Sequence, residues 1–383
     1  MADINIFDQR QWWDAARQFV SDMGVEPIDV GEPADEAWPK IKQAMALAGS
    51  PIGFGMDEAT VRSAVTTMLG LVVGVVQYSA DFTTAEYSKR GETAVVGDLL
   101  SVSRDGTNGK AAAVDGTYSS FAADTPRITD AGLLLETAAS NGVTNCDFAG
   151  AAIGIPGTPP TGAAAPFRSN CTQEITAVGT NSFGLPYIQI KWTTSASLAG
   201  SFNFKWDAAA TSPLAVVQGD TVCQSMWMTL MSGTMAGLTT FGMDVIQRSA
   251  SADLGAISGA NLKAVIDGVR QRIERTYTIA HASTTNARGQ ISGSFPSAAS
   301  FSFEVRFEAP QLEKASIASS PFKGQRAADM ATVKLPAGAA RDLTISIDGQ
   351  ADQVISAVPS GDYVIDPATL SGPLVTNIVW GSV

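Results

Sequence analysis

Two different spacings of apolar side chains divide the sequence. In the first 75 residues the apolar positions recur every three or four residues, which is the spacing of helices with one buried face. Three helices are predicted there, with apolar positions Trp12, Ala15, Ala16, Phe19 and Val20; Ile41, Met45 and Leu47; and Val61, Val65, Met68 and Leu69. A helical region so short and so rich in Trp and Met favours a docking or oligomerising role. A small autonomous bundle is the alternative.

From Val76 onward the spacing changes to an alternation of apolar and polar residues, which is typical of strands. The clearest examples are TVCQSMWMTL, FSFEVRFEA and DLTISIDG, and turn residues recur between such runs. One later segment, SGANLKAVIDGVRQRIE, hints at a helix, although RQRIERTYTIAH is also readable as a strand. Many short antiparallel strands without alternating helices predict a sandwich or jelly roll.

The same pattern predicts four segments. Residues 1–75 form the helical anchoring or oligomerisation region, residues 76–135 a β junction, and residues 136–335 a jelly roll. Residues 336–383 form a small C-terminal β unit after the linker-like stretch LPAGAARD. The predicted fold class is therefore mainly β: an antiparallel jelly-roll β-sandwich with a short N-terminal helical region and a small C-terminal β unit.

Composition argues against nucleic acids and anionic membranes as partners. The chain has 383 residues, of which 45% are apolar and 16% charged, with a net charge of −12. A nucleic-acid partner needs a basic surface, and an acidic chain gains nothing from an anionic membrane. No Sec-type signal is predicted, and the longest apolar run, Met68 to Val76, is about half a membrane span. We expect synthesis in a cytoplasm.

The three cysteines, Cys146, Cys171 and Cys223, are widely spaced. An odd number at such spacing fits neither a disulfide framework nor a metal knuckle. Buried free thiols are predicted, with a single Cys146–Cys171 bridge as the alternative.

Several motifs occur in an order that resembles a known assembly. They are DFTTAEYSKRG, GDLLSVSRDG, DGTYSSFAADTPRITDAGLLLE, a following TN, and APQLEKASIASSPFKGQRAAD near residues 309–329. This order, over about residues 78–335, resembles tail-fibre, spike and head-decoration proteins of phages and of phage-like particles such as gene transfer agents. The resemblance implies a jelly roll similar to carbohydrate-binding modules. The stretch NCDFAGAAIGIPGTPPTG departs from the family's aromatic-rich pattern after TN, so the resemblance does not fix the strand register there.

Arginines and glutamates within these motifs indicate an architectural role. Arg104, Arg127 and Arg326 stand beside Asp and turn residues, where a forked guanidinium can bind loop carbonyls or a carboxylate. Glu136 and Glu313 stand at the first and last strands of the predicted jelly roll, within reach of such an arginine. We expect these groups to pin an upstream β element onto the sandwich.

No catalytic residue is predicted. His281 is the single histidine, and the sequence has no nucleophile elbow with which it would form a triad. A polysaccharide depolymerase would need two opposed carboxylates, and Asp244, Glu274, Glu304 and Glu308 are the strand candidates. In FSFEVRFEA the charged positions alternate with Phe and Val, as on any solvated strand.

The sequence fits glycan binding better than glycan cleavage. Sugar-binding sites combine a flat aromatic ring with hydrogen-bonding side chains, and both are present. Alternation assigns Trp192 and Trp206 to the core. It puts Trp227 on the face of its own strand that is opposite the apolar face. The predicted glycan-binding residues are Trp227, Tyr187, Gln189, Lys191, Arg275 and Tyr277. The alternatives are that they contact another subunit or that Trp227 belongs to the core.

The resemblance also implies a structural Ca²⁺ between terminal strands, with no other cofactor required. Glu136, Asp147 and Glu308 are its candidate ligands, since calcium takes six to eight oxygens.

Together these features predict a structural virion protein, a spike, a fibre or a decoration protein on a particle surface. It would form a homo-oligomer, most simply a homotrimer, contact other virion proteins through its N-terminal region, and attach to host-surface polysaccharide. The alternatives are a purely architectural particle protein, a depolymerase and a chaperone-like assembly factor.

Overall fold

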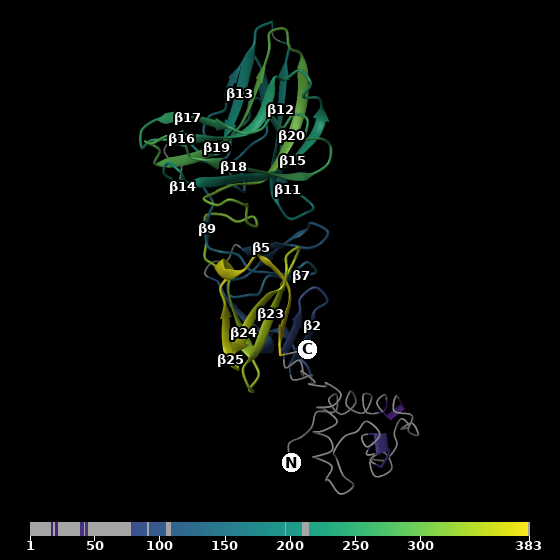
Figure 1. Ribbon diagram of the computed structural model, residues 1–383. Helices are drawn as coiled ribbons and strands as arrows, with labels where there is room; N and C mark the ends of the chain where they lie inside the picture. Colours follow the sequence, from purple (N-terminus) through teal and green to yellow (C-terminus); the bar gives the residue numbers. More distant parts are fainter. Residues whose placement is uncertain are drawn as a thin grey trace. The chain divides into compact units, whose positions relative to one another are not determined.

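The computed structural model describes residues 17, 20–21, 39–41, 43–44, 78–89, 92–104, 109–195, 197–208 and 214–381 (Figure 1). The helices predicted within residues 1–75 therefore lie outside the described residues, apart from single helical positions such as Ile41. The described chain is mainly β with antiparallel sheets, which confirms the predicted fold class. None of its described helices is long and apolar enough to cross a membrane.

The chain divides into two compact units. One comprises Met1–Ser101 together with Ala331–Val383, and the other comprises Val102–Met330. The second unit contains most of the predicted jelly roll and all of the predicted glycan-binding and metal residues.

The first unit joins the two ends of the described chain in one sheet, with the strand order β24-β23-β26-β1-β2-β3. These strands are β1 (Tyr78–Asp81), β2 (Glu86–Lys89), β3 (Glu92–Thr93), β23 (Arg341–Ile347), β24 (Gln353–Val358) and β26 (Leu374–Trp380). A second pair is β22 (Met330–Leu335) with β25 (Gly361–Ile365). Helix α4 (Val96–Leu99) and the short helix η2 (Pro367–Thr369) complete the unit, and strand β4 (Leu100–Ser103) continues from it into the second unit.

The pairing of β1 with β26 is the feature that local patterns do not reveal. Tyr78 lies opposite Trp380 in this pair, and both side chains are fully buried. The C-terminal strands, predicted as a separate small unit, thus share a sheet with residues of the predicted β junction.

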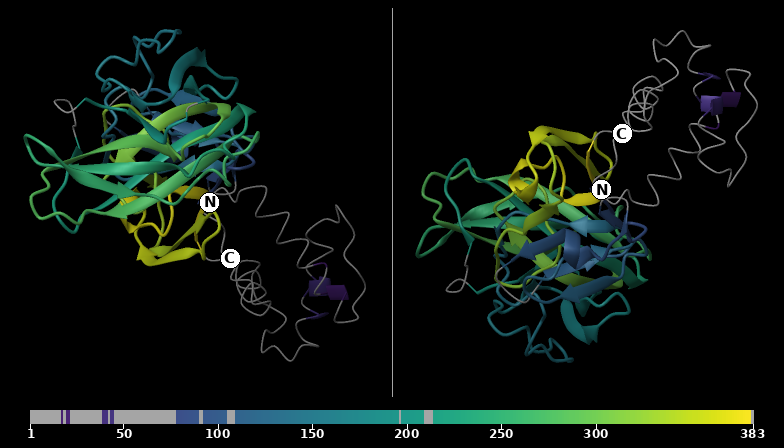
Figure 2. Two further views of the ribbon diagram at one scale, coloured as in Figure 1. Left: turned by 90° about the horizontal axis from the view of Figure 1, so that it is seen from above. Right: turned by 90° about the horizontal axis from the view of Figure 1, so that it is seen from below.

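The second unit is a sandwich of two antiparallel sheets (Figures 1 and 2). The five-stranded sheet has the order β11-β12-β20-β15-β18, with β11 (Thr172–Thr180), β12 (Pro186–Thr194), β15 (Thr221–Gly233), β18 (Gln271–Thr278) and β20 (Phe301–Glu313). The six-stranded sheet has the order β10-β13-β19-β16-β17, with β14 beside β19. Its strands are β10 (Phe167–Ser169), β13 (Gly200–Lys205), β14 (Leu214–Ala215), β16 (Thr240–Arg248), β17 (Asp253–Ser258) and β19 (Asn286–Phe295).

The core between the two sheets is rich in aromatic side chains. Trp192 on β12 stacks on Phe202 of the opposite sheet, with ring centroids 4.8 Å apart, and on Phe303 at 5.5 Å. Trp192 and Trp206 both belong to this buried cluster, as the alternation predicted. The residues that alternate with these aromatic side chains point away from the core and form the outer faces of the sheets.

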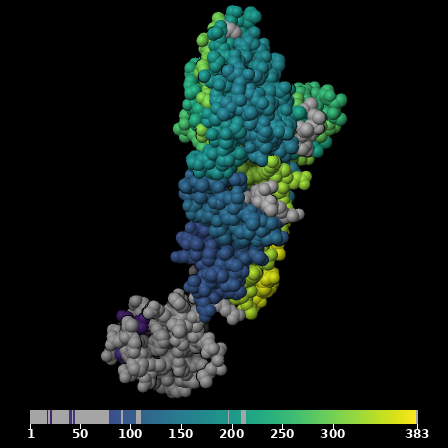
Figure 3. Space-filling view, turned by 180° about the vertical axis from the view of Figure 1, so that it is seen from behind, coloured from purple at the N-terminus to yellow at the C-terminus, as the bar shows by residue number. Residues whose placement is uncertain are grey.

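Shorter strands precede and follow the sandwich within the same unit. They are the hairpin of β5 (Gly109–Ala112) and β6 (Tyr118–Phe121), the hairpin of β7 (Ile128–Thr129) and β8 (Gly132–Leu134), and β9 (Ala139–Ser140) paired with β21 (Gln325–Arg326). Figure 3 shows this unit from behind, where segments that precede β15 form most of the visible surface. The segment SGANLKAVIDGVRQRIE, for which a helix was one possibility, is not helical, and its last four residues begin strand β18. All three cysteines are free thiols, as predicted, and Cys146 and Cys223 are buried, whereas Cys171 is only half-buried.

Candidate functional site

A buried ion network connects the chain segments on either side of the sandwich. Arg127 Nη1 lies 2.7 Å from Glu136 Oε2 and donates to the Lys110 carbonyl at 2.8 Å, and Arg127 Nη2 binds Asp329. Arg326 Nη1 contacts the same Glu136 oxygen at 2.9 Å. These side chains are at most 6% exposed. The predicted arginine clamp is confirmed for Arg127, Arg326 and Glu136. It is also confirmed for Arg104, which donates to the Phe121 carbonyl at 3.3 Å and lies 3.6 Å from Asp329 Oδ1.

The network fixes the charge of Glu136. Burial alone would raise the pKa of this carboxyl, but Arg326, Arg127 and hydrogen bonds from Ser320 outweigh burial and hold the pKa below its ordinary value. The neighbouring Glu313 has the opposite shift: burial raises the pKa of its carboxyl despite hydrogen bonds from Ser319. Asp329 and Ser320, which complete the network, stand within the matched closing motif but were not singled out from the sequence.

Three predicted glycan-binding residues lie together on the outer face of the five-stranded sheet. Tyr187, Gln189 and Lys191 alternate along β12 with the buried Ile188, Ile190 and Trp192. Their partners on β20 are Glu308, Arg306 and Glu304, in that order. The group Tyr187, Gln189, Lys191, Glu304 and Arg306 is called the β12–β20 face below.

Hydrogen bonds hold the β12–β20 face in one arrangement. Gln189 Oε1 accepts from Arg306 Nε at 2.9 Å and Nη2 at 2.6 Å, and Gln189 Nε2 donates to Glu304 Oε1 at 2.7 Å. The Arg306 guanidinium lies 4.3 Å from the centroid of the Tyr187 ring. A half-buried ring therefore stands against a guanidinium group, and the Gln189 amide links that group to the Glu304 carboxylate.

The charge state of Glu304 follows from the same contacts. Its partial burial would raise the pKa, but hydrogen bonds from Thr176, Gln189 and Ser232, together with Lys191, lower it below the ordinary value. A general acid in glycoside cleavage needs the opposite shift, because it must carry a proton near neutral pH. Glu304 is suited to accept hydrogen bonds rather than to donate a proton.

Trp227 occupies the outer face as predicted but is only 6% exposed. The Tyr118 ring meets it edge-on at 5.4 Å, and the Arg272 and Arg270 guanidinium groups lie 4.6 and 5.1 Å from its ring. Tyr118 belongs to the β5–β6 hairpin, about a hundred residues earlier in the chain. Alternation along a strand shows on which face a side chain lies, but not whether a distant hairpin covers that face. Trp227 is therefore covered and does not offer its ring to a sugar.

Tyr277 and Arg275 share a face, as predicted, but it is the inner one. Tyr277 lies in the core and donates its hydroxyl to the Met243 carbonyl at 2.6 Å. Arg275 is directly opposite Gln224, a fully buried inward position on β15, and donates to the Glu274 carbonyl at 2.8 Å. Neither is placed for glycan contact.

The three predicted calcium ligands do not form a common site. Glu136 is held by two arginines, Asp147 Oδ2 by Lys323 Nζ at 2.7 Å, and Glu308 Oε2 by Arg270 Nε at 2.7 Å. Across the residues that the structure describes, no group of three or more His, Cys, Asp or Glu side chains is placed to bind a metal ion. The prediction failed because each carboxylate has its own cationic partner, and this donor set does not fit calcium.

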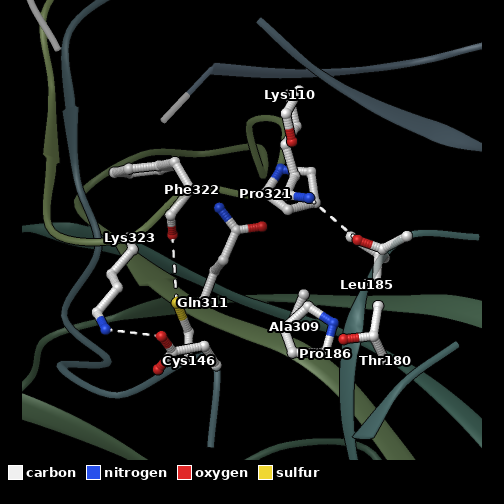
Figure 4. A pocket seen from close by; sticks show the side chains of 13 residues that line it. Lys110, Cys146, Thr180, Leu185, Pro186, Ala309, Gln311, Pro321, Phe322 and Lys323 are labelled. Atoms are coloured by element: carbon white, nitrogen blue, oxygen red, sulfur yellow. Dashed lines mark hydrogen bonds and ion pairs between the residues drawn. The ribbon is translucent and has the colours of Figure 1, made fainter. Parts of the chain in front are cut away.

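A pocket of about 340 Å³ opens where the β5–β6 hairpin meets the ends of β12 and β20 (Figure 4). Lys110, Gln311, Phe322 and Lys323 are among its lining residues, and Asp147 is the one carboxylate among them. Burial raises the pKa of the Cys146 thiol in its wall to about 12 and lowers that of Lys110. A protonated thiol and a single carboxylate paired with lysine do not provide the two opposed carboxyls of a glycosidase.

The sequence matches no protein-family model and no curated protein. Solved structures similar to this chain include carbohydrate-binding modules of the β-sandwich superfamily, at 15% identity and a TM-score of 0.33, covering 61% of this chain and 84% of theirs. A family 4 carbohydrate-binding module covers 45% of this chain and 99% of its own, at 12% identity and a TM-score of 0.25. The baseplate tripod of bacteriophage Tuc2009 is similar over 48% of this chain and 80% of its own, at 13% identity and a TM-score of 0.27. Likenesses this low carry no functional assignment.

Proposed function

We propose that this chain is a structural particle protein of the phage-virion type that attaches to host-surface glycans through the β12–β20 face without cleaving them. The observation that carries the proposal is the fixed placement of the Tyr187 ring against the Arg306 guanidinium, which Gln189 links in turn to Glu304. An aromatic ring contacts the apolar side of a sugar, and the neighbouring groups satisfy its hydroxyls. The ordered virion-type motifs of the sequence support the particle assignment.

Four carboxylates of this unit are already engaged by cations or hydrogen-bond donors, which is consistent with attachment without catalysis. Glu304 has a lowered pKa, Glu136 and Glu308 are bound by arginines, and Asp147 is bound by Lys323. A homotrimer on a particle surface would present several copies of the β12–β20 face at once. Linked sites raise overall avidity by roughly 10²–10⁴ over one site, so weak individual binding is sufficient. Contact with other virion proteins through residues 1–75 belongs to the same proposal.

We expect Tyr187→Ala to weaken binding to host-envelope glycans about tenfold, the size of one lost ring contact. Arg306→Ala should have a similar effect, because it removes the group that orients both Tyr187 and Gln189. The measurement is binding of the purified full chain to an array of host-envelope glycans, followed by titration of the best ligand. Tyr363→Ala, a half-buried tyrosine of the first unit, is the matched control.

Two results would contradict this proposal. Equal binding by wild type and Tyr187→Ala would remove the β12–β20 face from the interaction. Absence of any glycan ligand, for a protein that is a component of purified particles, would favour the purely architectural role.

A further inference from the structure

The outer face of the six-stranded sheet carries short polar side chains at its centre. Asn203 on β13 lies between the core residues Phe202 and Phe204, and Gln290 on β19 precedes the core residue Ile291. Asp244 on β16 lies between the core residues Met243 and Val245 and pairs directly with Gln290. Alternation therefore turns Asn203, Gln290 and Asp244 to the same outer surface.

Two buried acceptors on this surface lack a donor. Asp244 Oδ2 accepts from Gln290 Nε2 at 3.0 Å and from Ser292 Oγ at 2.5 Å. Because the carboxylate engages the amide nitrogen, it fixes the orientation of the amide and leaves Gln290 Oε1 as an acceptor. Gln290 is only 7% exposed, and neither its Oε1 nor Asn203 Oδ1 has a hydrogen-bond partner among the described residues.

Unpaired buried acceptors are costly, at about 1–3 kcal/mol each. Asn203 lies opposite Ser292, so Gln290 is its diagonal neighbour across the two strands, with the backbones roughly 7–8 Å apart. The two acceptors thus lie close enough together to be satisfied by one ligand that carries several hydroxyl donors.

An exposed aromatic ring adjoins these acceptors. Phe167 on the edge strand β10 pairs directly with Asn203, so the two side chains lie side by side on the outer surface. Phe167 is 51% exposed, whereas most of the phenylalanines in this unit are buried in the core. Phe167, Asn203, Gln290 and Asp244 are called the β10–β16 face below.

We propose that the β10–β16 face is a second saccharide-binding surface, and that it takes a neutral, hydroxyl-rich oligosaccharide. Sugar hydroxyls would donate to Gln290 Oε1 and Asn203 Oδ1, and the ring of Phe167 would cover an apolar side of the sugar. An acidic sugar is disfavoured, because its carboxylate would meet Asp244 and two acceptors. The nearby cations already share a carboxylate: Arg248 Nε and Arg288 Nη2 lie 2.7 and 2.5 Å from Asp253, and Lys205 Nζ lies 3.5 Å from it.

This surface uses no residue of the β12–β20 face, and the inference does not depend on the proposed function. The test is titration of the full chain with cello-, laminari-, xylo- and mannohexaose, with tri-galacturonate as the acidic comparison. The variants are Phe167→Ala and Asn203→Ala, with Tyr363→Ala in the first unit as the control. Thermal unfolding of each variant verifies the fold.

We expect at least one neutral hexasaccharide to bind, and each of Phe167→Ala and Asn203→Ala to weaken it about tenfold, as for one lost ring contact or hydrogen bond. Tyr363→Ala should leave this binding unchanged. Asn203→Ala should also keep or slightly raise the unfolding temperature, because it removes an unpaired buried acceptor. No binding of any neutral hexasaccharide, unchanged binding by both variants, or a preference for the galacturonate would overturn the inference.

Discussion

Replacing Arg127 by alanine is expected to lower the free energy of unfolding by about 3–5 kcal/mol, the cost of removing one partner of a buried ion pair. The substitution leaves Glu136 and Asp329, both almost fully buried, without their shared cation. It also removes the donor to the Lys110 carbonyl, which connects the network to strand β5. Urea denaturation at neutral pH measures the loss.

The exposed Arg168 provides the control, since Arg168→Ala should change the unfolding free energy by no more than about 0.5 kcal/mol. An Arg127→Ala variant as stable as the control would show that the buried network does not hold this part of the unit together.

The pH dependence of that loss has a definite sign. The folded-state pKa of Glu136 is lowered, so its ionised form stabilises the fold above the ordinary value of 4.5, and this contribution disappears as pH falls through the lower folded pKa. The stability difference between wild type and Arg127→Ala should therefore be full near neutral pH and shrink on acidification. A difference that grows as pH falls below 4.5 would contradict this electrostatic origin.

Trp192→Ala is expected to destabilise the sandwich by about 3–5 kcal/mol, the usual cost of removing a large aromatic side chain from a core. Trp192 is fully buried and its ring contacts Phe202, Phe241, Phe303 and Phe307, which come from both sheets. Its loss would leave a cavity at the centre of the interface between the sheets. The measurement is again the free energy of unfolding in urea.

Two variants bracket this result. Trp192→Phe keeps part of the ring contacts and should lose clearly less stability, while Phe167→Ala removes a half-exposed ring and should lose little. A loss of less than 1 kcal/mol for Trp192→Ala would contradict the central position of this residue in the core.

Local patterns in the sequence predicted those features that depend on a few neighbouring residues. The alternation in FSFEVRFEA correctly separated the buried Phe301, Phe303 and Phe307 from the outward Glu304 and Arg306. It also placed Trp192 in the core, and the charged residues of the motifs identified most of the arginine network. These successes share one cause, since strand geometry converts sequence position directly into a face.

The failures concern contacts between distant segments. Alternation showed that Arg275 and Tyr277 share a face but not that this face meets the other sheet, where Tyr277 donates to Met243. Trp227 lies on the outer face, yet Tyr118 from a separate hairpin covers it. No local pattern indicates the β10–β16 face, because its four residues come from four strands and only the pairing of those strands brings them together.

The most direct test of the proposed function follows binding and cleavage in one experiment. The purified full chain is incubated with host-envelope polysaccharide, and bound protein and newly formed reducing ends are both measured over time for wild type and Tyr187→Ala. The expected result is saturable binding that is weaker in Tyr187→Ala, with no reducing ends above the protein-free control. Reducing ends that increase in proportion to the amount of wild-type protein would contradict a surface that holds sugar without cutting it.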